Sequence, residues 1–165
     1  MQVVGQFLSD FAMDNRETNP QVSLFARSAF NRYYYAIFLT TRRLIVETTG
    51  VSKLPHKDLP NYLIGPFRKT IKQKIKTAVR SGMLSHAYSA SQLDALKQNT
   101  HLLSQILVTA YSVRVLADYE PDVAVEFKDQ TYKLGASTLS EATNWASRAQ
   151  IHCKSLYKVW RNLGN

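Results

Sequence analysis

Residues 27–38 read Arg-Ser-Ala-Phe-Asn-Arg-Tyr-Tyr-Tyr-Ala-Ile-Phe, and this run lies inside a long segment with helical periodicity. Between residues 22 and 48, apolar side chains recur at steps of three and four, as they do on an amphipathic helix. Asn19-Pro20 and Gly50 mark the two ends, because proline disfavours helix in the residue before it and glycine readily terminates one. The segment predicts one long helix. Its buried row is expected to contain Phe30, Tyr34, Ile37 and Phe38.

Four further segments complete the expected architecture. A short helix is predicted over residues 3–13. A second follows the loop of residues 52–60 and ends at Ser81-Gly82, and its inner face is expected to contain Leu63, Ile64, Phe67, Ile71, Ile75 and Ala78. Another is expected from an N-cap at Ser91 to about residue 117, and the last from near residue 140 to near residue 163. Residues 123–127 alternate like a strand, but a lone strand has no partner, so an extended linker and no sheet are expected. The sequence thus predicts an all-α, up-and-down bundle of four to five helices in a single domain, residues 1–165.

The composition and motifs of the chain exclude several classes of protein. One cysteine, Cys153, excludes an internal disulfide framework and a multi-cysteine zinc site. The longest apolar stretch, residues 33–39, is far shorter than the ~20 residues that span a bilayer, and the N-terminus lacks a basic leader, so a cytoplasmic protein is expected. No glycine-rich phosphate loop, nucleophile elbow or metal-ligand spacing is visible, so neither a metal nor a cofactor is expected.

The net charge of +9 favours an anionic partner. Between Lys53 and Arg80, eight basic residues face one acidic residue, Asp58. A helical stripe within this segment is either a solvated face or a contact surface for the phosphate backbone of RNA. The stripe consists of Arg68, Lys69, Lys72, Lys76 and Arg80.

Two polar groups accompany the predicted helices. Asn31 and Arg32 lie beside the aromatic row and either line a groove or make surface hydrogen bonds. Arg114 and Asp118 are four residues apart at a helix end, where they are able to form an ion pair and to point toward the same position. Tyr119 follows directly.

These two segments carry a family resemblance. Residues 27–38 resemble the SRAYYAAFHAA helix of prokaryotic HEPN proteins, and residues 114–119, Arg-Val-Leu-Ala-Asp-Tyr, resemble their RxxADY segment. Between them lies a loop histidine, His56, followed by a helix, and an alanine-containing C-terminal helix completes the family order. The resemblance covers roughly residues 22–160.

The resemblance implies a compact helical bundle that commonly dimerises through the face carrying Arg114. Many HEPN proteins are metal-independent ribonucleases of toxin–antitoxin, abortive-infection or CRISPR-linked defence systems, and others only bind RNA or nucleotides. Active members usually show an arginine, then four to six intervening residues and then a histidine, whereas at the matching place this chain has Arg114, Asp118 and Tyr119 and no histidine. Aspartate normally titrates near ~4, so this departure bears directly on acid–base cleavage.

Two hypotheses follow. The first is a metal-independent endoribonuclease in which Arg114 holds the phosphate and Asp118, Tyr119 and His56 complete the catalytic group. The second is an inactive HEPN module that binds RNA, a nucleotide or a protein partner. Both include a homodimer and leave room for an antitoxin or other protein partner. The residues expected to contact RNA or a nucleotide are Asn31, Arg32, Tyr35, Arg68, Lys69, Lys72, Lys76 and Arg80.

Overall fold

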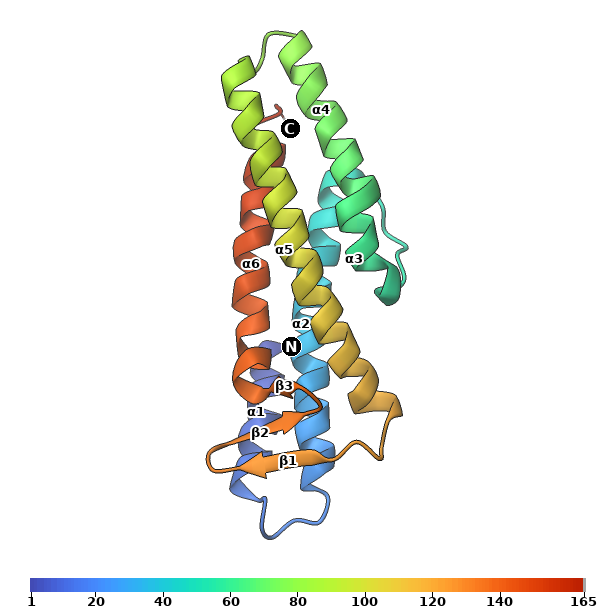
Figure 1. Ribbon diagram of the computed structural model, residues 1–165, viewed down its shortest axis with the longest axis vertical. Helices are drawn as coiled ribbons and strands as arrows, with labels where there is room; N and C mark the ends of the chain where they lie inside the picture. Colours follow the sequence, from blue (N-terminus) through green and yellow to red (C-terminus); the bar gives the residue numbers. More distant parts are fainter. Residues whose placement is uncertain (165) are drawn as a thin grey trace. The chain divides into compact units, whose positions relative to one another are not determined.

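The structure is a computed structural model that describes residues 1–164. Helices dominate it, and the strands within the described residues form one small sheet (Figure 1). The all-α helical-bundle class expected from the sequence is therefore confirmed. In chain order the elements are α1 (Gln2–Asp14), α2 (Val22–Thr49), η1 (His56–Asp58), α3 (Leu59–Tyr62), η2 (Leu63–Phe67), α4 (Arg68–Arg80), α5 (His86–Tyr119), β1 (Val125–Lys128), β2 (Thr131–Leu134), β3 (Ser137–Thr138) and α6 (Leu139–Arg161).

The contacts within the chain group into two compact units. The first unit comprises Met1–Leu39 and Val108–Ser147, and the second comprises Thr40–Leu107 and the residues from Arg148 onward. Helices α2, α5 and α6 each contribute one part to the first unit and one part to the second. The single-domain organisation expected from the sequence stays a prediction.

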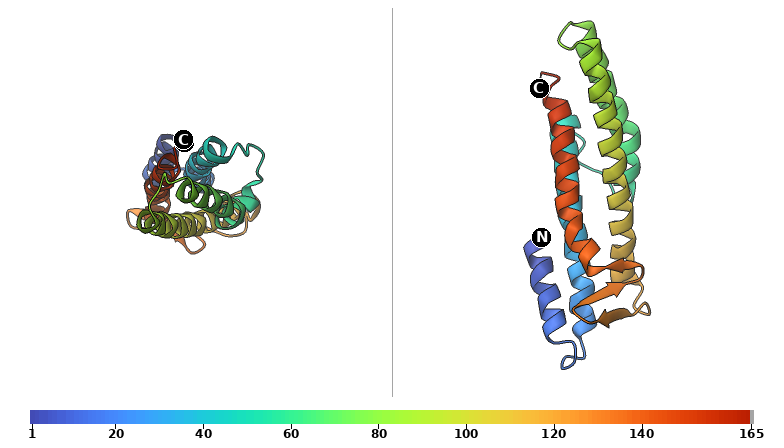
Figure 2. Two further views of the ribbon diagram at one scale, coloured as in Figure 1. Left: turned by 90° about the horizontal axis from the view of Figure 1, so that it is seen from above. Right: turned by 60° about the vertical axis from the view of Figure 1, so that its left-hand side comes forward.

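Aromatic side chains of α2 organise the core of the first unit. The ring of Phe30, only 1% exposed, lies edge-on to that of Tyr132, with 5.6 Å between the centroids. The centroid of Trp145, on α6, is 6.5 Å from that of Phe30. Helix α1 lies along the same part of α2 (Figure 2, right), where a Cβ on Gly5 would come within 3.0 Å of the Tyr33 ring. The buried row predicted for this helix is confirmed, since Phe30, Tyr34, Ile37 and Phe38 are all buried.

A three-stranded antiparallel sheet, in the order β1-β2-β3, follows α5 and leads into α6. The expectation of an extended linker without a sheet was wrong, because β1 has a partner in β2, with Val125 opposite Leu134. The turn between them holds Asp129 at φ 50°, a left-handed conformation that aspartate tolerates without the glycine that usually signals a hairpin. Tyr132 and Leu134 alternate along β2, and both are buried in the core.

One glycine fixes how the sheet meets α5. Gly135, between β2 and β3, has φ 58°, and a Cβ at this position would lie 2.8 Å from Cδ1 of Leu116. A larger residue would therefore be strained and would also clash with the last turn of α5. The absence of a side chain allows the hairpin to lie close to the helix end.

In the second unit, α4 lies beside the first part of α5 (Figure 1). Arg68 joins these two helices, because its Nε and Nη2 donate to Oγ1 of Thr100 at 3.0 and 2.8 Å. Ser104 of α5 donates to the carbonyl oxygen of Pro60 at 3.2 Å. The inner face predicted for this helical segment is confirmed for Leu63, Phe67, Ile71, Ile75 and Ala78, which are buried.

A π-helical turn, η2, connects α3 to α4. Pro66 lies inside it and has no N–H to donate, so the regular hydrogen-bond ladder is interrupted there. Ile64, which the periodicity placed on the inner face, is instead 39% exposed. The prediction for this residue was wrong because a π turn shifts the phase of the helix and a regular α-helical count does not include that shift.

Helix α5 begins earlier than the sequence indicated. Its first residue is His86 rather than the position after Ser91, because Ser85 acts as the capping residue. The Oγ of Ser85 accepts a hydrogen bond from the backbone N–H of Tyr88 at 3.2 Å, which satisfies one donor of the first turn. Ser91 lies within the helix, where its hydroxyl donates to the carbonyl oxygen of Tyr88.

Truncating the aromatic core of the first unit is expected to be costly. Phe30→Ala removes the ring that contacts both Tyr132 and Trp145, and should lower the free energy of unfolding by about 3 to 5 kcal/mol. Phe7→Ala, at a position 69% exposed on α1, is the matched control and should change it by less than about 0.5 kcal/mol. Urea unfolding followed by circular dichroism measures both, and equal losses would contradict this description of the core.

Candidate functional site

The two segments that carry the family resemblance meet at the end of α5. Arg27, on α2, is only 8% exposed, and its guanidinium donates to backbone carbonyls of the last turn of α5 and of the linker that follows. Nη1 contacts the oxygens of Leu116 and Ala117 at 2.8 and 3.4 Å. Nη2 contacts those of Glu120 and Pro121, each at 3.1 Å, and also that of Val123.

This arrangement explains why an arginine is buried here. The last carbonyls of a helix have no partner within it and carry the negative end of the helix dipole. The planar guanidinium of Arg27 offers five N–H donors and a positive charge, so it satisfies several of these oxygens together. Arg27 therefore fixes the direction in which α5 ends. No sequence pattern predicts this role for Arg27, because the carbonyls that it binds are about 90 residues away along the chain.

One helical turn beyond Arg27, Asn31 reaches the side chain of Asp118. Nδ2 of Asn31 donates to Oδ1 of this carboxylate. The other carboxylate oxygen, Oδ2, accepts from Nη2 of Arg114 at 2.8 Å. Both oxygens of Asp118 are thus engaged, one by a neutral amide and the other by a cation.

Tyr119 covers the guanidinium of Arg114 from a second side. Its hydroxyl lies 3.4 Å from Nη2, and the centre of the guanidinium lies 5.1 Å from the centroid of its ring. Burial alone lowers the pKa of Arg114, but the hydrogen bond to Tyr119 and the charge of Asp118 outweigh it and raise the pKa above its ordinary value. Asn31, Arg114, Asp118 and Tyr119 are called the Arg114 cluster below.

The Arg114 cluster combines enclosed and open parts. The side chains of Arg114 and Asp118 are 17% and 25% exposed, whereas Tyr119 is 64% exposed. Two buried atoms, Oδ1 of Asn31 and Nε of Arg114, have no hydrogen-bond partner among residues 1–164. Buried polar atoms are almost always paired, so these two mark unused hydrogen-bonding capacity inside the cluster.

Several site residues predicted from the sequence therefore converge. Asn31, Arg114, Asp118 and Tyr119 form the cluster, and Tyr35 lies near enough to interact electrostatically with Arg114. Arg32 is exposed on a different face of α2, where its Cβ faces Gly5 of α1. It is not part of the cluster.

The remaining predicted residues belong to the second unit. His56 lies in η1, which belongs to the second unit, whereas the Arg114 cluster belongs to the first. Within the basic stripe, Arg68 is committed to Thr100 and to the carbonyl oxygen of Lys97, so it has a structural role. The other members of the stripe, Lys69, Lys72, Lys76 and Arg80, are exposed on α4.

The lone thiol is enclosed. Cys153 lies on α6 and is 3% exposed. Burial raises the pKa of its thiol to about 12, and the neighbouring Thr41 side chain lowers it only in part. The thiolate is the reactive form of cysteine, so Cys153 is not set up as a nucleophile.

Residues 1–164 show neither a cluster of metal-ligating side chains nor a helix that could span a membrane. Within residues 1–164, no group of three or more His, Cys, Asp or Glu side chains is placed to hold a metal ion. None of the helices in that part of the chain combines the length and the apolar character needed to cross a bilayer.

Comparison with known proteins finds one distant similarity. An uncharacterized protein of Methanocaldococcus jannaschii is 29% identical to the chain over 111 residues. The match covers 61% of this chain and 51% of that protein, so it spans about half of the length of its relative. No protein-family profile matches the chain, and no solved structure gives a significant match. The HEPN resemblance therefore stays a prediction.

Replacing Arg27 should destabilise the first unit. Arg27→Met removes a buried cation that donates to several part-buried carbonyls, and we expect a loss of about 3 kcal/mol in the free energy of unfolding. Arg27→Lys keeps the charge but not the planar fork, so it should restore only part of that stability. The control is Arg32→Met, an exposed arginine on the same helix, with an expected change within about 0.5 kcal/mol. Urea unfolding compares the three, and unchanged stability in Arg27→Met would refute the role given to this residue.

The buried thiol gives a second prediction. Cys153 in the folded protein should not react with Ellman's reagent at pH 8, because its thiol is enclosed and its pKa is raised to about 12. One thiol per chain should appear once guanidinium unfolds the protein, which serves as the internal control. Rapid reaction of the native protein would mean that Cys153 is accessible and reactive.

Proposed function

We propose that this chain is a HEPN-type protein that binds single-stranded RNA through the Arg114 cluster. The observation that carries the proposal is the meeting of the two resembling segments. Asn31, from the segment on α2, contacts Asp118, from the segment on α5, and Arg27 anchors the same helix end. Segments separated by more than 80 residues are brought together, which supports reading them as parts of one site.

The exposed part of the cluster suits a nucleic-acid ligand. The ring of Tyr119 is 64% exposed and is able to stack against an unpaired base, as aromatic side chains commonly do in proteins that bind single strands. The guanidinium of Arg114, 5.1 Å from the centre of this ring, supplies a fixed positive charge for a neighbouring phosphate. The chain's net charge of +9 adds attraction for a polyanion at longer range.

Binding without cleavage fits the chemistry of the first unit better than catalysis. All four histidines, at positions 56, 86, 101 and 152, belong to the second unit, as does the only cysteine. The first unit therefore holds no side chain whose ordinary pKa lies near neutrality. Both oxygens of Asp118 are also engaged, by Asn31 and Arg114, which leaves this carboxylate poorly placed to accept a proton from a ribose hydroxyl.

Cleavage is the second candidate function. It is favoured by the convergence of a cation, a carboxylate and a phenol hydroxyl in Arg114, Asp118 and Tyr119. Arg114 would then stabilise the charge that develops on the phosphate, and Asp118 would move the proton that an active HEPN enzyme passes through histidine. His56 would have to reach the cluster as a further proton carrier.

The cellular setting forms part of the same proposal. A cytoplasmic homodimer that acts in a toxin–antitoxin or antiphage defence system would match the role of many HEPN proteins. A protein partner such as an antitoxin would then control access to the RNA. Growth of cells that overexpress the chain tests this setting, since a toxic effector should arrest growth and lose its toxicity in Arg114→Ala.

RNA binding is tested first by filter binding with a labelled single-stranded oligonucleotide in EDTA. Arg114→Ala and Tyr119→Ala should each raise the Kd by about ten- to a hundredfold, and the affinity should fall as salt increases. Tyr119→Phe keeps the stacking surface and should bind nearly as well as the wild type. Arg43→Ala, at an exposed arginine of the second unit, is the control for a general loss of charge.

One substitution separates binding from cleavage. Asp118→Asn removes a negative charge beside Arg114, so a binding site should hold RNA more tightly, by about two- to tenfold in Kd. A ribonuclease that uses this carboxylate should instead lose cleavage of labelled total RNA in the same variant. Cleavage in EDTA that disappears in both Asp118→Asn and Arg114→Ala would replace the binding proposal by the catalytic one. A protein that neither binds nor cleaves RNA would overturn both.

A further inference from the structure

The second unit contains an open groove along α4. Its cavity volume is about 710 Å³, and it is walled by α4 and closed at one end by Met83 and Leu163. It is separate from the residues assigned to RNA binding in the Arg114 cluster, all of which belong to the first unit. We call it the α4 groove.

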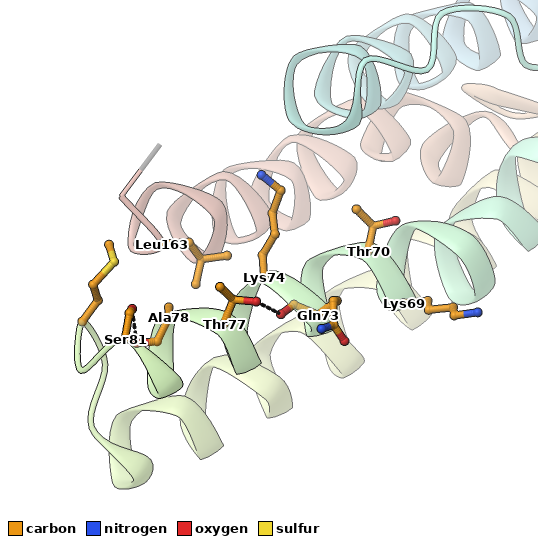
Figure 3. Close-up of a pocket in the computed structure, with 9 residues that line it drawn as sticks. Lys69, Thr70, Gln73, Lys74, Thr77, Ala78, Ser81 and Leu163 are labelled. Carbon is orange, nitrogen blue, oxygen red and sulfur yellow. Dashed lines mark hydrogen bonds between the residues drawn. The ribbon is translucent and has the colours of Figure 1, made fainter.

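The spacing of residues along α4 builds one wall of this groove. Thr70, Lys74 and Ala78 follow one another at steps of four, and Thr77 and Ser81 form a parallel row beside them. Figure 3 shows Leu163 reaching from the C-terminal turn to a position beside Ala78 and Thr77.

The apolar end of the groove is formed by Met83, in the turn after α4, and by Leu163, in the C-terminal turn. Leu163 and Ala78 are 8% and 4% exposed, whereas Met83, after the end of α4, is 60% exposed. Gly164, at φ 80°, lies directly against Met83, because a Cβ at this position would come within 2.7 Å of the methionine methyl carbon. The groove thus offers an aliphatic end with a flexible thioether, a side chain that adapts to varied apolar partners.

The rim of the groove is cationic. Lys69 and Lys74 line it, and no acidic or aromatic side chain is found among the lining residues that the structure describes. Lys72, Lys76 and Arg80 continue the positive charge along α4, which has no aspartate or glutamate over its whole length. An occupant should therefore be acidic on the side that meets the lysines.

We propose that the α4 groove binds an acidic, amphipathic helix of a partner protein. An aliphatic end without aromatic rings offers no platform for stacking nucleobases, but it accepts leucine-like side chains of a helix laid into a groove. The lysine rim complements acidic residues on the flanks of such a helix.

The dimensions agree with a short helical segment. The lining residues of α4 and its C-cap run from Lys69 to Ser81, which corresponds to a length of about 18 Å at the helical rise per residue. A partner helix of about three turns, or roughly 12 residues, covers that distance. The apolar side chains on one face of such a helix would reach Ala78, Met83 and Leu163.

The test is a titration of the full chain, labelled with ¹³C at the methionine methyl groups, with a designed peptide of glutamate and leucine in amphipathic order. The chain has three methionines, and two of them, Met1 and Met13, lie in the first unit and serve as internal controls. The Met83 signal should shift in a saturable manner while those of Met1 and Met13 stay in place. A scrambled peptide of equal composition should leave Met83 unchanged, as should a single-stranded RNA oligonucleotide.

Variants of α4 locate the binding surface. Lys69→Glu, on the rim, should raise the Kd of the peptide about tenfold, and Thr77→Trp, which fills the groove, should raise it at least as much. Lys76→Glu is the matched control, because this exposed lysine is on the same helix but is not among the residues that line the groove. It should change the Kd by less than about twofold, since its side chain does not line the groove and its charge is screened by solvent from a peptide bound there. Unchanged Met1 and Met13 signals and helical circular dichroism confirm that each variant is folded.

Several results would overturn the proposal. An unchanged Met83 signal at millimolar peptide would mean that the groove does not take an acidic helix. An equal effect of Lys76→Glu and Lys69→Glu would mean that the peptide senses only the general positive charge of α4. A Met83 shift with the RNA oligonucleotide would assign the groove to nucleic acid instead. Arg114→Ala distinguishes this proposal from the RNA proposal, because it should weaken RNA binding and leave peptide binding intact.

Discussion

The arrangement of the first unit depends on the buried guanidinium of Arg27. The last carbonyls of a helix have no donor within it, and several at the end of α5 are bound by the guanidinium of Arg27 on a neighbouring helix. This contact fixes the end of α5, and with it the positions of Arg114, Asp118 and Tyr119, which all lie within that helix's last six residues. Asn31, one turn beyond Arg27 on the same helix, is thereby brought to Asp118. A structural contact and the candidate site thus share one pair of helices.

The charges around this contact divide into two kinds. Arg27 is buried and donates to backbone carbonyls, so its charge is neutralised in part by the negative end of the α5 helix dipole. Arg114 faces one carboxylate and one exposed ring, so part of its hydrogen-bonding capacity remains unused. Arg27 therefore has a structural role, whereas Arg114, on the adjacent helix, belongs to the candidate site. Only the second has the open side that recognition of a ligand requires.

Much of the fold follows from patterns within single segments. The periodicity of residues 22–48 gives the buried face of α2, and the cluster of Arg114, Asp118 and Tyr119 lies at the helix end where their spacing indicated it. The β-sheet was not predicted because the turn before its second strand, Thr131–Leu134, contains no glycine. Asp129 adopts the left-handed conformation there that glycine usually provides in a hairpin. Arg27 was missed because its partners are backbone atoms, whose positions no residue type reveals. His56, by contrast, was grouped with the cluster by its order in the chain alone, and it belongs to the other unit.

The π turn between α3 and α4 determines which side of α4 faces the core. A π turn closes over one residue more than an α turn, so α4 is rotated by roughly 100° relative to an uninterrupted continuation of α3. That rotation directs Ile71 and Ile75 inward and leaves the lysines of α4 facing outward. Loss of a single residue from Leu63–Phe67 would turn the charged side of α4 toward the core. The number of residues in this turn is therefore constrained more tightly than their identity, and insertions or deletions should be tolerated in the loops before η1 and after α4 rather than within the turn.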